Sequence, residues 1–365
     1  MPGDTGLVTS FTVEELVVPA TIAAPDAADF VESIGIRNLV EALGYGTREL
    51  EMTAAETLPF WLDRENSPHR LFGARVDGRL VGRGFYETNV GDGDQVAWTT
   101  VEVLPEYRRR GIGTAIADHI EAVARAEGRG RLLVYVVSPD GPGGRLAAAT
   151  GFGSVPLAND EVRFLLARGF ALEQVERGSR LPLPLDDGEL RAALAAASDE
   201  SGAGYAVHSW TGATPVRWLD DLAVLYTRMS TDAPSAGLEE PEDVWTAERV
   251  RAEDERQAAS PRTPVTAAVE HVETGRLVGF TVLSVPPDTA RSVGQFDTLV
   301  LREHRGHRLG ALLKLANLVA LQEGHPGYPS VITFNAEENR PMLRVNEAMG
   351  FVPVGYEGAW RKNLS

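Results

Sequence analysis

The 365-residue chain contains no cysteine, which excludes disulfides, thiolate metal sites and a cysteine nucleophile. It also lacks any uninterrupted apolar stretch near the ~18 to 20 residues that span a bilayer. Residues 1–10 have neither the basic nor the apolar region of a leader peptide. We therefore expect a cytoplasmic protein without a membrane or metal partner.

Basic residues are scarce relative to acidic ones. Lys and Arg number 35 against 52 Asp and Glu, a formal charge of −17. Nucleic acids and anionic membranes bind clusters of Lys and Arg, and they repel a protein with a net negative charge. Neither is therefore an expected partner. A cationic substrate fits the charge better, although surplus carboxylates can also serve solubility alone. Hydrophobic residues at 43% and charged residues at 24% are typical of a globular protein.

The length suggests two domains, and an internal repeat supports this. The pentapeptide Gly78–Gly82 recurs unchanged as Gly275–Gly279, an offset of 197 residues. The same offset relates Arg108 to Arg305, Gly113 to Gly310, and residues 132–136 to 329–333. Gly169-Phe170 and Gly350-Phe351 match at an offset of 181, which predicts 16 extra residues in the first copy, within the Gly- and Pro-rich loop 138–158.

The residue patterns of each copy predict a mixed α/β fold of the α+β type. In the first copy the patterns predict strands at 12–18, 70–76, 79–90, 95–103 and 131–137, and helices at 26–43, 54–64, 112–126 and 160–168. Asp77-Gly78 predicts a tight turn. The second copy begins near Tyr205, has helices at 215–229 and 242–259, and ends with a strand near Asn363. We predict domains at 1–185 and 204–365, joined by the linker 186–203, which holds a short helical stretch.

A strand, a basic glycine-containing turn and a helix follow one another at residues 101–126. Exposed N–H groups at a helix start, the helix dipole and nearby arginines all favour a phosphate ligand, and glycines let it approach the main chain. His304 and His307 decorate the corresponding turn of the second copy, and they lack neighbouring residues that would complete a metal site.

Arg108, Gly111 and Gly113 resemble the pyrophosphate-binding motif of the GNAT acetyltransferases. The second copy keeps Arg305 and Gly310 but has Arg308 at the middle glycine position, where a guanidinium would crowd or pair with the pyrophosphate. The resemblance covers both halves and implies tandem GNAT folds, each with a mostly antiparallel sheet and a splayed central parallel strand pair that admits acetyl-CoA. It implies cofactor contacts from Val101, Val103, Arg108, Arg109, Arg110, Gly111, Ile112, Gly113 and Thr114, and from Val300, Arg305, Gly306, His307, Arg308, Leu309, Gly310, Asn335 and Asn339.

Acyl transfer to an amine needs a base, an oxyanion partner and a proton for the leaving thiolate. Glu102 and Asp297 lie on the strands that lead into the two turns, and each is a candidate base or a solvent-facing carboxylate. The tyrosine that many relatives use as the acid is replaced by Leu165 and Asn346. Asn346 remains a candidate at that position, and the proton can also come from solvent or another tyrosine.

The sequence therefore predicts an acyl-CoA-dependent N-acyltransferase, with acetyl-CoA and no metal, that acts on the amine of a small molecule. We expect a monomer or homodimer. Two alternatives remain open: a protein or peptide lysine acetyltransferase, and a tandem protein in which one or both copies bind coenzyme A or only support the fold. No Gly-x-Ser-x-Gly element of a serine hydrolase is present.

Overall fold

The computed structural model describes residues 10–89, 95–232, 234–239 and 241–364. The chain divides into two compact units. Unit 1 comprises Met1–Val137, Ala158–Leu172 and Gly358–Ser365, and unit 2 comprises Ser138–Leu157 and Glu173–Glu357. The domain limits 1–185, 186–203 and 204–365 stay a prediction. Residues 1–9 and the predicted end of a strand at residue 90 lie outside the described residues.

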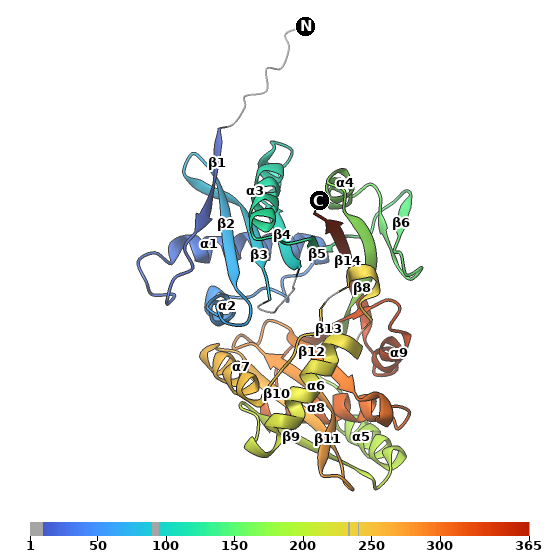
Figure 1. The fold of residues 1–365 in the computed structure, drawn as a ribbon. Coiled ribbons are helices and arrows are strands. Elements are labelled where there is room, and N and C mark those ends of the chain that lie inside the picture. The colour runs from blue at the N-terminus through green and yellow to red at the C-terminus, as the bar shows by residue number, and fades with distance from the viewer. Residues whose placement is uncertain (1–9, 90–94, 233, 240, 365) are drawn as a thin grey trace. The chain divides into compact units, whose positions relative to one another are not determined.

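Unit 1 contains the first half of the chain's elements, with bounds close to those expected from the sequence. They are β1 (Phe11–Leu16), α1 (Ala28–Tyr45), α2 (Ala54–Trp61), β2 (His69–Val76), β3 (Arg79–Glu87), β4 (Val96–Val103), α3 (Ile112–Ala126), β5 (Arg131–Val137) and α4 (Asp160–Ala167). Its strands lie in the order β1-β2-β3-β4-β5, followed by β14 (Val352–Asn363), the last strand of the chain (Figure 1). All neighbours from β1 to β4 are antiparallel, while β4 and β5 are parallel.

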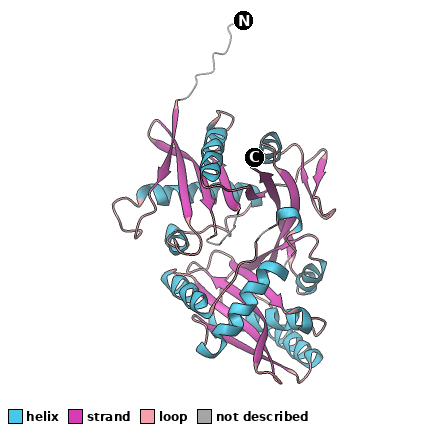
Figure 2. Ribbon diagram, viewed as in Figure 1, coloured by secondary structure: helices cyan, strands magenta, loops and turns pink. Residues whose placement is uncertain are grey.

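Unit 2 repeats this plan. Its elements are β8 (Ala171–Pro182), α5 (Asp187–Ser201), β9 (Tyr205–Thr211), α6 (Leu219–Asp232), α7 (Ala247–Ala259), β10 (Thr263–His271), β11 (Arg276–Val285), β12 (Val293–Val300), α8 (Leu309–Gly324), β13 (Ser330–Ala336), α9 (Arg340–Ala348) and β14 (Val352–Asn363). The strand order is β8-β13-β12-β11-β10-β9, with β12 and β13 parallel. Helices flank the strands of each unit in Figure 2.

The repeated pentapeptide has a structural reason. Asp77 and Gly78 both have positive φ, 49° and 81°, and form the predicted two-residue hairpin turn. Further along, a Cβ on Gly82 would lie 3.2 Å from the carbonyl oxygen of Glu102, and one on Gly279 would lie 2.8 Å from that of Leu299. Glycine at these positions lets β3 and β11 approach the next strand closely.

Helices cover both faces of each sheet. A Cβ on Gly84 would meet Ile116 and Ile120 of α3, whereas the adjacent Arg83 lies 5.8 Å from the Trp61 ring of α2. Because neighbouring strand residues point to opposite faces, α3 and α2 lie on opposite sides of the unit 1 sheet. Gly279 and Phe280 place α8 and α6 in the same way on unit 2.

The last strands of the two copies are exchanged between the units. β8 follows the first copy in sequence, yet residues 176–182 pair with β13 of unit 2. The final residues of β14 belong to unit 1, where the Leu364 N–H donates to the Gly130 carbonyl over 2.7 Å. Each unit is therefore completed by a strand that sequence order assigns to the other copy.

Two sequence-based details need correction. Val96 pairs with Arg131 and Val293 with Val331, so β4 and β12 correspond at the predicted offset of 197, whereas β5 and β13 correspond at 200. The expected loop 138–158 carries a two-stranded sheet, β6 (Arg145–Ala147) and β7 (Ser154–Pro156). Helix α5, within the predicted linker, packs into the core of unit 2 through Leu190 and Ala197.

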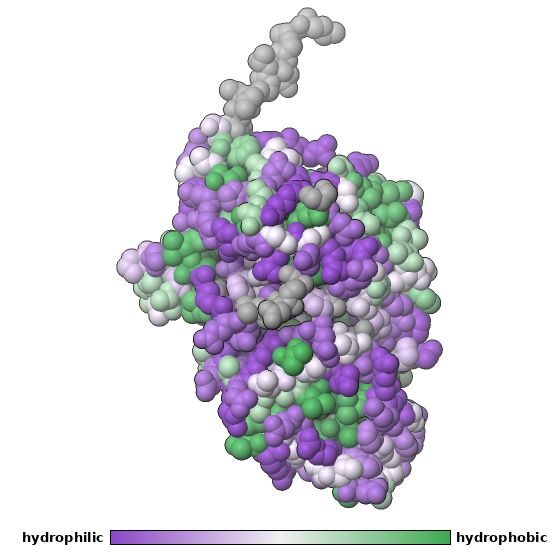
Figure 3. All heavy atoms as spheres, in the orientation of Figure 1, coloured by the Kyte–Doolittle hydropathy of each residue, from purple (hydrophilic) through white to green (hydrophobic). Residues whose placement is uncertain are grey.

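Hydrophilic residues predominate on the face drawn in Figure 3. No helix within the described ranges is long and apolar enough to cross a membrane. The same described ranges contain no group of three His, Cys, Asp or Glu residues able to hold a metal ion.

Candidate active site

The basic turn of the first copy has the backbone of an anion-binding loop. Arg109 and Gly111 both adopt left-handed conformations, with φ of 63° and 84°, and α3 begins immediately afterwards at Ile112. The first N–H groups of a helix have no intrahelical acceptor and point outward along the dipole. Open space surrounds the position of a Cβ on Gly111, so a ligand can reach the main chain there.

The second copy keeps this backbone despite its different sequence. Gly306 and Arg308 have φ of 92° and 53°, at the positions of Arg109 and Gly111. Each turn therefore holds one glycine and one arginine in a left-handed conformation, in reversed order. The Arg308 side chain is 61% exposed and forms an ion pair of 2.8 Å with Glu200 of α5.

The parallel strands beside each turn separate, as the family resemblance implied. Pairing of β4 with β5 ends at Trp98 and Leu133, although β4 continues to Val103. Pairing of β12 with β13 ends at Gln295 and Thr333. The remaining residues of β4 and β12 thus have main-chain groups without a parallel partner strand.

Val103 and Val300 direct main-chain groups into these openings. The N–H of Leu104 donates to Val81 on β3, so the preceding residue faces the opposite edge, toward β5. Arg108 Nε donates to the Val103 carbonyl over 3.0 Å. In unit 2 Leu301 donates to Val278, and Arg305 Nε donates to the Val300 carbonyl over 3.0 Å.

The remaining residues predicted to contact the cofactor line the same turns. Ile112, Gly113 and Thr114 form the first turn of α3, and Leu309 and Gly310 begin α8, while Val101 lies on the separated part of β4. A Cβ on Gly113 would lie 3.6 Å from Val103 and 3.9 Å from Phe164 of α4. Arg110 donates to the Glu106 carbonyl, and the His307 carbonyl accepts from Ser201. Open main chain, left-handed turns and arginines fit a diphosphate in both copies.

The two candidate bases lie in different surroundings. Glu102 is buried on β4 and forms an ion pair of 3.1 Å with the equally buried Arg83 of β3. The guanidinium compensates the charge of the carboxylate and holds it on the face of the sheet that α2 covers. It gives Glu102 a structural partner that a free base would not have.

Asp297 has no ion-pair partner among the described residues. The ladder between β11 and β12 shifts between Thr281 and Leu283, and Phe296-Asp297 form the bulge. Burial, together with the charge of Glu253, raises the pKa of Asp297 to about 6. A half-buried carboxylate that ionises near neutrality is suited to accept a proton from an amine.

The asparagines of unit 2 have defined structural contacts. Asn339 is the N-cap of α9, and its side chain accepts from the Met342 N–H. Asn346 is buried, and its Nδ2 donates to Asn335 Oδ1 over 2.7 Å, while its own Oδ1 has no hydrogen-bond partner. Leu165, at the corresponding place in α4, is also buried.

Sequence reasoning missed an aromatic cluster beside Asp297. Tyr226 of α6 lies with its ring 4.6 Å from Trp245 and 5.0 Å from Phe280. Burial and the charges of Asp297 and Glu253 raise the pKa of Tyr226, so its hydroxyl stays protonated. Tyr226 is four residues from Leu222 on the predicted helix 215–229, and this spacing does not distinguish a core residue from a site residue.

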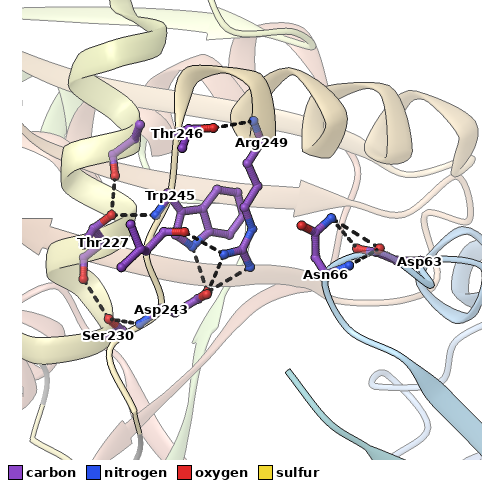
Figure 4. A network of polar contacts seen from close by, with 10 residues as sticks. Asp63, Asn66, Thr227, Ser230, Asp243, Trp245, Thr246 and Arg249 are labelled. Atoms are coloured by element: carbon purple, nitrogen blue, oxygen red, sulfur yellow. Dashed lines mark hydrogen bonds and ion pairs between the residues drawn. The ribbon is translucent and has the colours of Figure 1, made fainter. Parts of the chain in front are cut away.

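Trp245 is held rigidly by hydrogen bonds (Figure 4). Its main-chain N–H donates to Thr227, and its indole donates to Asp243, each over 2.8 Å. Arg249 lies 4.1 Å over the ring and also pairs with Asp243. Trp245 lines a groove of about 490 Å³ together with Asp220, Thr227, Arg228, Glu242 and Glu248.

Comparisons with known proteins agree with this geometry. Residues 38–152 match the Acetyltransferase (GNAT) family. A mycothiol acetyltransferase from Thermomonospora curvata is 30% identical over 252 residues, which is 69% of each chain. The solved tandem GNAT protein from the clavulanic acid biosynthesis pathway superposes with a TM-score of 0.69 at 24% identity, over 97% of this chain and 98% of that one. A GCN5-related N-acetyltransferase from Sphaerobacter thermophilus gives 0.59 at 14% identity, over 97% and 95%.

Two GNAT folds with splayed strands and phosphate-type turns define an acyl-transfer protein. The chain belongs to the GNAT acetyltransferase family and is an N-acetyltransferase with tandem GNAT folds. Members of this family use acetyl-CoA.

Proposed function

We propose that this protein transfers an acetyl group from acetyl-CoA to the amine of a small molecule, and that the second copy carries the reaction. The observation behind this proposal is the opening beside β12. There the end of β12 has no parallel partner strand, and the following turn holds Arg308 in a left-handed conformation. Asp297 on the same strand has no ion-pair partner among the described residues and has a raised pKa.

In this proposal Asp297 accepts the proton of the attacking amine. The Val300 main chain lies toward the opening, where an N–H can stabilise negative charge on the thioester oxygen. Acetyl-CoA supplies the activated acyl group, and the turn from Arg305 to Gly310 holds its diphosphate. Tyr226 keeps its proton at neutral pH and is a candidate for delivering it to the leaving thiolate.

A small amine is the favoured acceptor class. The net charge of −17 and the aromatic and acidic residues around Asp297 favour a cation. The relative named mycothiol acetyltransferase acts, by its name, on a small molecule.

A second role is proposed for the first copy: binding coenzyme A without transferring the acetyl group. It retains the turn and the strand opening, but its carboxylate is held by Arg83. The residue that corresponds to Asp297 at the repeat offset is Thr100, which cannot act as a carboxylate base.

Calorimetry with acetyl-CoA tests the cofactor sites. We expect two sites in the native chain and one each in Gly111→Trp and Gly310→Trp. Gly324→Trp is a matched control, because Gly324 is also in α8 with open space around it but lies at the far end. Absence of binding to the native chain would remove the basis of the proposal.

Transfer is tested separately by thiol release from acetyl-CoA with a panel of primary amines. We expect release with the native chain and Gly111→Trp, and loss with Gly310→Trp. If Gly111→Trp abolishes transfer while Gly310→Trp retains it, the reaction belongs to the first copy.

A further inference from the structure

Lys314 is a buried cation without an anionic partner. The sequence contains two lysines, Lys314 and Lys362. Lys362 forms an ion pair with Glu121. Lys314 is 1% exposed and has no ion-pair partner among the described residues, and its Nζ lies 5.6 Å from the Phe351 ring. Burial lowers the pKa of Lys314 to about 7. A buried lysine is costly unless something compensates its charge.

The elements packed against α8 offer no such compensation. Most ionisable groups on these elements pair elsewhere: Asp187 with Arg191, Glu200 with Arg308, Tyr205 with His304, His208 with Glu270, His271 with Thr274, Arg276 with Asp221, Arg340 with Glu337 and Glu347 with Arg177. Glu189 and Asp199 on α5 and Arg344 on α9 are exposed. Asp297 lies near Tyr226 and Glu253, on the face of the sheet opposite α8. The Lys314 amine therefore has no anionic side chain beside it among the described residues.

Its position on α8 connects it to the phosphate-type turn. Lys314 lies four residues after Gly310, so the two share one face of the helix. Side chains of a helix lean toward its N-terminus, which directs Lys314 back toward the turn. Gly310 has no side chain, and the space beside it is open. At the repeat offset, the first copy has Ala117 in place of this lysine.

The surface cations of the second turn are already engaged. Arg305 pairs with the buried Asp232 at 2.9 Å, and Arg308 pairs with Glu200 at 2.8 Å. In the first copy Arg108 and Arg110 donate only to carbonyl oxygens, and Arg109 is 77% exposed with a long 3.5 Å contact to Asp160. The second turn thus has less free positive charge at its surface and one more cation beneath it.

We propose that Lys314 is the buried counter-charge for the anionic diphosphate of acyl-CoA at the second copy. The inference rests on the proposed function, since it requires coenzyme A to occupy this turn. Lys314 acts as a positioning residue for the cofactor. When the diphosphate binds, the Lys314 amine takes up a proton, and the cation formed pairs with the diphosphate.

The first test compares coenzyme A with pantetheine, which has no diphosphate, in a Gly111→Trp background that leaves the second site. We expect Lys314→Met to weaken coenzyme A by about 10- to 100-fold, the range of a charge-assisted hydrogen bond. Pantetheine affinity should change little. An equal loss for both ligands would indicate a packing role and overturn the proposal, as would no loss for either.

The second test measures proton uptake. Calorimetry of coenzyme A at pH 7.5 in buffers of different ionisation enthalpy should give an uptake of up to one proton at the second site, absent in Lys314→Met. Lys314→Leu provides a second variant, because replacing a lone buried charge with an apolar group of similar size is expected to preserve the fold. Equal uptake by the native chain and both variants would contradict the inference.

These outcomes are distinguishable from failure of the proposed function. If the Gly111→Trp protein binds no coenzyme A, the second site itself is wrong. If it binds coenzyme A with the same affinity and proton uptake after Lys314→Met, the second site stands and only the role of Lys314 is wrong.

Discussion

The Nζ of Lys362 lies 2.6 Å from Oε1 of Glu121, so an ion pair joins the end of the chain to α3 of the first copy. Arg168, in the segment after α4, reaches the same carboxylate over 2.6 Å. Both cations and Glu121 are largely buried. This network fixes the last strand in unit 1, although 241 residues separate its two ends.

Lys362→Met should destabilise unit 1 by about 1–3 kcal/mol, because Glu121 loses one of its buried partners. A stop codon after Glu357 should have a larger effect, because it removes the part of β14 that belongs to unit 1. Hydrogen exchange of unit 1 amides, compared with those of unit 2, is the measurement. Unchanged exchange in α3 of the truncated chain would contradict the strand exchange.

Arg83 and Glu102 should behave as a structural pair. Arg83→Met leaves a buried carboxylate alone and should cost about 3–5 kcal/mol, while the double variant Arg83→Met/Glu102→Leu should recover most of that loss. Denaturant unfolding measures both. Thiol release by the double variant is the functional check, and its loss would return Glu102 to the role of base.

Asp297→Asn should lower kcat/KM by about 10²- to 10⁴-fold, the usual contribution of a general base. The native kcat/KM should rise with pH through about 6, as Asp297 loses its proton, and this limb should vanish in the variant. Coenzyme A affinity should stay constant.

The raised pKa of Asp297 also predicts whether Asp297→Asn stabilises or destabilises the fold at a given pH. A folded-state pKa raised above the unfolded value means that the native protein loses stability as pH rises through about 6. Asp297→Asn should therefore unfold at a higher temperature than the native chain at pH 7.5, with the two converging below pH 4. A variant less stable at pH 7.5 would indicate an unrecognised favourable contact.

Two arginines occupy left-handed positions that suit glycine. Arg109→Gly and Arg308→Gly should each remove about 1 kcal/mol of backbone strain. Arg308→Gly also loses the exposed pair with Glu200, which contributes less than about 1 kcal/mol. Arg110→Gly is the control, since its φ is not positive. Thermal unfolding should place the control below the other two variants.

Much of the fold could be read from local sequence. Helix α3 and strand β5 have the predicted bounds, because a helix with regular apolar spacing, a glycine stop and a β-branched run depend on neighbouring residues alone. The Asp77-Gly78 hairpin turn follows from the same local rules. The repeat at offset 197 likewise predicted that Arg108 and Arg305 have matching roles, and both bond the carbonyl five residues earlier.

The backbone of the second turn was not predictable in this way. Arg308 stands where the motif has glycine, and residue type alone left open whether its guanidinium crowds the pyrophosphate or pairs with it. The structure retains the left-handed conformation there, because the following helix and the preceding strand fix the path of the chain. Site residues also need burial information: Glu102 and Asp297 look alike in sequence, yet one has a buried arginine beside it and the other does not.

The sequence by itself determined the two-copy architecture, the family resemblance and the positions of both phosphate-type turns, since all of these are encoded in short contiguous segments. Only the tertiary structure decided which final strand completes which unit, which carboxylate is free to titrate, and that Lys314 is a lone buried cation. Those properties depend on contacts between residues far apart in the chain, where burial and ion pairing change the free energy of a charge and sequence spacing carries no record of them.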